Sequence, residues 1–79
     1  MTTTADRIRK IVIAYLDCDP EKATDDAKLE DMGADSLDAV EITMAIEEEF
    51  DIEFRDEEAD QVDTIATAAK LVDAKLAAA

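Results

Sequence analysis

The sequence predicts an all-α protein, a four-helix bundle with three longer helices, one short helix and a long loop between the first two. Apolar residues recur three and four positions apart in three stretches, which is the spacing of one helical face. The 79 residues include one glycine and one proline, so little of the chain favours turns. We predict one domain over residues 1–79, whose core uses nearly all of the large apolar side chains.

The first helix is predicted from Ala5 to Asp17, with Thr3 or Thr4 as its cap. Its inner face is expected to contain Ile8, Ile11, Val12, Tyr15 and Leu16. Residues 18–34 lose the helical periodicity, so we predict a long loop with one helical turn. Two apolar residues are expected to pin this loop to the core, Leu29 and Met32.

The second helix is the best-defined element of the sequence. Asp35 or Ser36 can cap its start, and the helix is expected to end near Phe50. Asp38 in the first turn suits the positive end of the helix dipole. Asp51 then breaks the apolar pattern.

This helix carries two apolar stripes, whereas a helix in a small bundle normally needs one. At about 100° per residue, the stripe assigned to the core contains Ala39, Ile42, Thr43, Ile46 and Phe50. The other stripe, Leu37, Val40 and Met44, is expected to face outward beside Glu41, Glu47 and Glu48. Either the short helix or the long loop covers the outward stripe, or it is a docking strip with an acidic rim for basic partners; we favour docking.

The last part of the chain predicts two more helices. Residues 56–60 form a short acidic helix, held by Ile52, Phe54 and Val62. Asp63 or Thr64 caps the final helix, which runs to about Leu76. Its apolar side is expected to contain Ile65, Ala68, Ala69, Leu71, Val72 and Leu76.

Composition excludes several functions. The net charge of -14 disfavours nucleic acid and anionic membranes as partners, and it favours basic proteins. With no histidine and no room for a deep cleft, the protein is predicted not to be an enzyme. We also predict a monomer. Cys18 is the only cysteine, which fits a cytoplasmic protein, and we interpret it as a half-buried apolar residue. We predict no specific metal site: the acidic clusters are interpreted as a solvated face, and residues 19–30 lack the ligands and glycine of a calcium loop.

Ser36 carries a hydroxyl group at the predicted start of the second helix, and it lies in the run Gly33-Ala34-Asp35-Ser36-Leu37-Asp38. This run and the segment that continues to Phe50 closely resemble the acyl carrier proteins of bacterial dissociated (type II) fatty acid synthesis. Looser similarity extends to residues 7–11 and 56–59. The resemblance implies that Ser36 bears a covalent phosphopantetheine arm, whose thiol holds an acyl chain as a thioester.

The same resemblance assigns roles to other residues. Asp35 and Asp38 are expected to help present Ser36 to a phosphopantetheinyl transferase. The face offered to the synthase enzymes contains Leu37, Val40, Glu41, Met44, Glu47 and Glu48.

The carried acyl chain is expected to slide between the helices. The space that shelters it is predicted to be lined by Leu29, Ile42, Ile46, Val62, Ala68 and Leu71. A dedicated carrier for a specialised lipid or polyketide pathway remains the alternative function. An acidic module that only docks to basic proteins is a further one.

Overall fold

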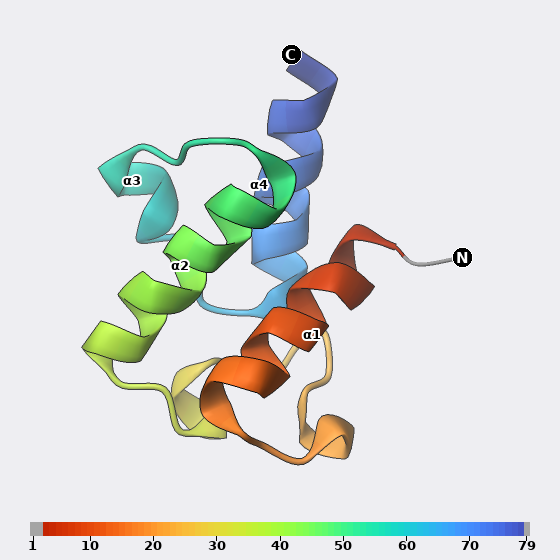
Figure 1. The fold of residues 1–79 in the computed structure, drawn as a ribbon, viewed down its shortest axis with the longest axis vertical. Coiled ribbons are helices and arrows are strands. Elements are labelled where there is room, and N and C mark those ends of the chain that lie inside the picture. The colour runs from red at the N-terminus through yellow and green to blue at the C-terminus, as the bar shows by residue number, and fades with distance from the viewer. Residues whose placement is uncertain (1–2, 79) are drawn as a thin grey trace.

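A computed structural model describes residues 3–78, and within them the chain folds into four α-helices and two 3₁₀ turns (Figure 1). The predicted all-α architecture, with three longer helices and one short helix, is confirmed. Met1, Thr2 and Ala79, which the one-domain prediction includes, lie outside the described residues. The helices are α1 (Thr4–Leu16), α2 (Ser36–Phe50), α3 (Asp56–Ala59) and α4 (Ile65–Ala78).

Helix α1 packs against α2 and α4, and in Figure 1 α2 lies between α1 and α3. In the core stripe predicted for α2, Ile42, Ile46 and Phe50 are buried, whereas Ala39 and Thr43 are half-buried. No helix of residues 3–78 is both long and apolar enough to span a membrane. The buried core consists of Ile8, Val12, Ala23, Leu29, Ile42, Ile46, Phe50, Val62, Ile65, Ala68 and Val72.

Two residues expected on inner faces are exposed instead. Tyr15 is 49% exposed in the last turn of α1, where its phenol group stays accessible to water. Leu76 is 44% exposed because it lies near the end of α4, which projects beyond the other helices (Figure 1). A helical period cannot show where the neighbouring helix ends.

The long loop contains two short turns rather than one, η1 (Pro20–Lys22) and η2 (Glu30–Met32). Backbone bonds join this loop to the start of α4. The N–H of Leu29 donates to the Asp63 carbonyl at 2.8 Å, and the N–H of Ala66 donates to the Asp25 carbonyl at 3.0 Å. Backbone bonds of this kind leave no signal in the side-chain pattern.

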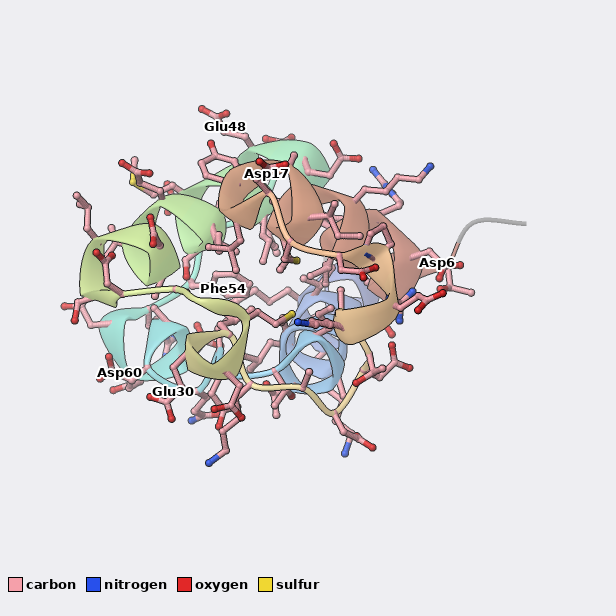
Figure 2. All side chains as sticks on the ribbon, turned by 90° about the horizontal axis from the view of Figure 1, so that it is seen from below. Asp6, Asp17, Glu30, Glu48, Phe54 and Asp60 are labelled. Atoms are coloured by element: carbon pink, nitrogen blue, oxygen red, sulfur yellow. The ribbon has the colours of Figure 1, made fainter. Side chains whose placement is uncertain are left out.

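Arg9 of α1 holds the same loop through its side chain. Its Nε donates to the Ala23 carbonyl at 2.8 Å, and its guanidinium pairs with Asp25 and, at 2.6 Å, with Asp6. Carboxylates surround the outline of the molecule in Figure 2, so a cation at this position experiences attraction from several of them. The loop is therefore anchored to α1 by one arginine.

Asp17 and Asp51 follow the last residues of α1 and α2, and both have left-handed backbone conformations, with φ of 49° and 54°. Glycine is the residue that adopts this conformation without steric cost. A carboxylate at a helix C-terminus is also unfavourable, because that end of the dipole is negative.

Asp17→Gly is therefore expected to stabilise the protein by about 1 kcal/mol, which corresponds to a rise in Tm of about 4–8 °C for a domain of this size. Thermal melts followed by circular dichroism measure the change. Asp60→Gly is the matched control: it removes the same charge where φ is -64°, so it gains no relief of strain. Equal Tm shifts in the two variants would contradict the backbone explanation.

Asp6 forms a reciprocal cap with Thr3 at the start of α1. The Thr3 backbone N–H donates to the Asp6 carboxylate at 3.3 Å, and Thr3 Oγ1 accepts from the Asp6 N–H at 3.1 Å. Bonding by the Thr3 backbone, then by the Thr3 side chain and Arg9, lowers the pKa of Asp6 below its ordinary value of 3.8. The charged carboxylate is thus the form that the fold stabilises.

Asp6→Asn should lower the Tm at neutral pH. Because the folded pKa lies below the unfolded one, the stabilisation is present above pH 3.8 and is lost as the pH falls through the folded pKa. The difference in Tm from the wild type should therefore disappear in strong acid. Thermal melts from neutral pH to strong acid test the direction of this pH dependence. Asp26→Asn is the control for loss of one exposed loop charge. A difference that persists in strong acid would refute the linkage.

Candidate functional site

Ser36 is the first residue of α2, and its side chain is exposed. Asp35, not Ser36, caps the helix. Asp35 Oδ1 accepts from the Asp38 N–H at 2.8 Å, and Asp38 Oδ2 accepts from the Asp35 N–H at 3.2 Å. Because these two carboxylates satisfy the cap, the Ser36 hydroxyl is not needed for it.

Gly33 directs the chain to this entrance. Its φ of 101° lies in the left-handed region, where side chains are strained, and it ends the turn η2. The N–H of Gly33 donates to the Glu30 carbonyl at 3.1 Å, and the N–H of Ala34 donates to the Leu29 carbonyl at 3.0 Å. The only glycine of the chain thus fixes the approach to Ser36.

The entrance of α2 suits an attached anion in one respect. The helix offers no carbonyl to the N–H groups of Ser36 and Leu37, and the positive end of its dipole lies there. A phosphate on Ser36 could accept from these groups, which would offset repulsion by Asp35 and Asp38. The residues present therefore fit a phosphate ester at this hydroxyl.

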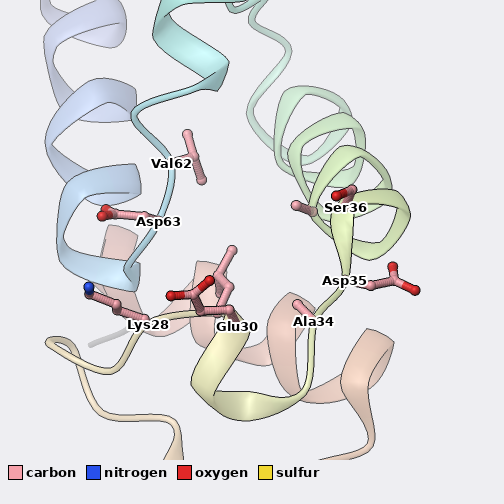
Figure 3. A pocket seen from close by; sticks show the side chains of 9 residues that line it. Lys28, Glu30, Ala34, Asp35, Ser36, Val62 and Asp63 are labelled. Carbon is pink, nitrogen blue, oxygen red and sulfur yellow. The ribbon is translucent and has the colours of Figure 1, made fainter.

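Two grooves meet at Ser36. The entrance groove is lined by Lys28, Leu29, Ala34, Ser36, Val62 and Asp63, among others. Figure 3 shows Ser36 on one side of it, Val62 and Asp63 on the other, and the Asp35 side chain pointing away. The residues around this groove include one basic residue, Lys28, and three acidic ones, Glu30, Asp35 and Asp63, so its surroundings carry net negative charge and favour a basic partner.

The second groove runs between α2 and α3, and we call it the α2–α3 groove. Ser36, Val40 and Met44 line its α2 side, while Phe54, Ala59 and Val62 line the opposite side. Sequence reasoning did not assign Phe54 and Ala59 to any site, because their approach to α2 depends on the path of the connecting segment.

The outward stripe of α2 is exposed in the structure. Leu37, Val40 and Met44 have exposed fractions of 65%, 55% and 59%, and Glu41 and Glu48 are exposed beside them. The alternative in which α3 or the long loop covers this stripe is therefore wrong. Large apolar side chains with an acidic rim are left facing outward.

Glu47 differs from the other acids of this face. Its Oε2 accepts from the Phe54 backbone N–H at 2.8 Å, and its side chain is half-buried. The Glu47 carboxylate therefore holds the segment before α3 in place, although Glu47 itself belongs to α2. Nothing in the local sequence pattern signals this bond, since the two residues lie seven positions apart on different elements.

The residues predicted to shelter an acyl chain all lie on the inside of the bundle. Leu29, Ile42, Ile46, Val62 and Ala68 are buried, and Leu71 is half-buried against the core. Of these, Leu29 and Val62 also line the entrance groove. Within residues 3–78, no group of three or more Cys, Asp or Glu side chains is arranged to hold a metal ion.

Comparison with known proteins identifies the family. The family model described as a phosphopantetheine attachment site matches residues 6–72. An acyl carrier protein from Phenylobacterium zucineum is 51% identical over 79 residues, covering 99% of this chain and 100% of its own length. The chain belongs to the acyl carrier protein family.

Further relatives agree. An acyl carrier protein from Caulobacter vibrioides is 51% identical over 78 residues, covering 98% of this chain and 100% of its own length. A solved acyl carrier protein from Enterococcus faecalis superposes with a TM-score of 0.77 at 26% identity, covering 91% of this chain and 92% of that one. The predicted resemblance to the acyl carrier proteins of fatty acid synthesis is confirmed. The non-catalytic carrier role and the phosphopantetheine cofactor are confirmed with it.

Asp35→Ala should lower the free energy of unfolding by about 1 kcal/mol, because it removes the N-cap of α2. Asp35→Asn should remain close to the wild type, since asparagine caps a helix about as well. Urea unfolding measures both, and Glu41→Ala, an exposed site one turn into the helix, controls for loss of charge alone. If Asp35→Asn were as unstable as Asp35→Ala, the cap would not be the reason.

Proposed function

We propose that Ser36 carries the phosphopantetheine arm through a phosphodiester, and that the arm holds the acyl chains of fatty acid synthesis as thioesters. The observation that supports this most is that the helix cap and the exposed hydroxyl belong to two different residues at the start of α2. Asp35 caps the helix, and Ser36, the only serine of the chain, is exposed beside it. When bound, the arm supplies a reactive thiol at the end of a flexible tether.

An outside enzyme must form this bond. A serine hydroxyl is a weak nucleophile without a neighbouring base, and the chain contains no histidine. Asp35 and Asp38 are held by their mutual hydrogen bonds, so their negative charges are fixed in the same turn as Ser36. We infer a basic phosphopantetheinyl transferase that recognises this charge.

The synthase enzymes are proposed to dock on the outward face of α2. Leu37, Val40 and Met44 supply apolar contact area, and Glu41 and Glu48 attract basic surfaces from a distance. Glu47 contributes charge to this face while its carboxylate is bonded to Phe54. The net charge of -14 agrees with partners of opposite sign.

The acyl chain is proposed to enter the bundle from the grooves beside Ser36. Leu29 and Val62 are core residues that also line the entrance groove, so they connect the surface to the buried Ile42, Ile46 and Ala68. These core side chains are almost fully covered, so a guest chain must displace them or α3. Leu71 completes the proposed shelter on α4. We further propose that the protein acts in the cytoplasm as a monomer.

Incubation with a phosphopantetheinyl transferase and coenzyme A tests the attachment. The wild type should gain the mass of one phosphopantetheine, and Ser36→Ala should gain none, because no other serine is present. Thr24→Ala, which removes an exposed loop hydroxyl, should be modified like the wild type. Intact-mass spectrometry followed by peptide mapping reads the result, and a group found on any other side chain would overturn the proposal.

A further inference from the structure

Helix α3 has little support from the other helices, yet it forms one wall of the α2–α3 groove. It is a single turn, and the most extensive helix contacts are those of α1 with α2 and α4. Ala59 at the end of α3 lines the groove together with Phe54 and Val62, opposite Ser36. The position of this wall therefore depends on a small number of side-chain interactions.

Two carboxylates fix the segment, one from each side. On the α2 side, Glu47 Oε2 accepts from the Phe54 N–H at 2.8 Å. On the α4 side, Glu58 Oε1 accepts from the Arg55 N–H at 2.9 Å and pairs with Lys75 Nζ at 2.8 Å. Hydrogen bonding to Lys75 is the main reason that the pKa of Glu58 lies below its ordinary value of 4.5, so the pair is charged at neutral pH.

Lys75 joins α3 to the groove itself. Its Nζ lies 5.9 Å from the centre of the Phe54 ring, within the range of a cation–π contact. Both side chains of the Lys75–Glu58 pair are 24% exposed, whereas those of the neighbouring Arg55–Glu57 pair are 80% and 74% exposed. Water screens the Lys75 pair less, so it is the stronger of the two.

We propose that Lys75 is a positioning residue for the acyl chain: acting through Glu58 and Phe54, it holds α3 in place as the outer wall of the α2–α3 groove. The proposal rests on the proposed attachment at Ser36. A long chain that lies between α2 and α3 is shielded by this wall, whereas an acetyl group is too short to reach it. Without Lys75 the wall moves away more often, and the thioester of a long chain becomes accessible to nucleophiles.

Thioester cleavage by hydroxylamine tests this on the full chain bearing phosphopantetheine. Hydroxylamine attacks the thioester carbonyl, the C–S bond breaks, the thiol stays on the arm and the acyl group leaves as a hydroxamate. Each variant is loaded with either a palmitoyl or an acetyl group, and intact mass follows cleavage with time. Lys75→Met should raise the palmitoyl cleavage rate several-fold and leave the acetyl rate unchanged.

Four further variants separate the effect of the position of Lys75 from the effect of its charge. Lys75→Arg keeps the cation and should retain the wild-type rates, and Lys70→Met removes the same charge from an exposed residue of α4 and should do likewise. Glu58→Gln breaks the pair from the other side, and it keeps the test available if Lys75→Met folds poorly. Glu58→Gln should raise the palmitoyl rate. The Lys75→Met/Glu58→Gln double variant should be no faster than Lys75→Met alone, because Lys75→Met already lacks the contact that Glu58→Gln breaks.

Unchanged palmitoyl rates in Lys75→Met or Glu58→Gln would overturn the role of Lys75. An equal rise for the acetyl group would also overturn it, since that result indicates general loosening of the fold. Failure of the arm to load at Ser36 would overturn the proposed function and this inference together. A loaded protein with unchanged rates would overturn the inference alone.

Discussion

The reciprocal cap between Asp35 and Asp38 is the interaction on which the proposed attachment site at Ser36 depends. Serine is itself a favoured N-cap residue, and a capping hydroxyl is bonded to the backbone of the first turn. Here Asp35 takes that bond at 2.8 Å, so Ser36 moves to the first helical position with its side chain exposed. The two carboxylates repel a phosphate, but they also hold the helix entrance in one geometry. The cap thus positions the hydroxyl with the same charges that we propose attract a basic transferase.

A small number of basic side chains connect separate elements of the fold. Against 22 acidic residues the chain has 8 basic ones, and within residues 3–78 three of these join separate elements. Arg7 pairs with Glu49 at 2.6 Å and lies 4.2 Å from the centre of the Phe50 ring, so it ties α1 to the end of α2. Arg9 anchors the long loop, and Lys75 ties α4 to α3. In so negative a molecule each such cation interacts with many carboxylates, and the outward acids of α2 remain available for basic partners.

The sequence predicted local features better than distant pairings. The bounds of α2 agree with the structure because a cap, a dipole-matched acid and a left-handed aspartate all lie within the chain segment itself. The outward direction of Leu37, Val40 and Met44 followed from helical geometry in the same way. The second 3₁₀ turn, the Glu47 bond to Phe54 and the Lys75–Glu58 pair could not be predicted. Each depends on how loops bring separate elements together.

The helices differ in how extensively they pack: α1, α2 and α4 are packed together, and α3 is held less firmly. Helices α1, α2 and α4 share the buried core, including Ile8, Ile42 and Val72, and opening them would expose large apolar area. Helix α3 contributes Ala59 as its one apolar side chain and is held mainly by polar ties. Because polar ties at a surface exchange with water at low cost, we expect a guest chain to displace α3 more easily than any other helix. The groove beside Ser36 is therefore expected to open on the α3 side, where the core loses least apolar contact.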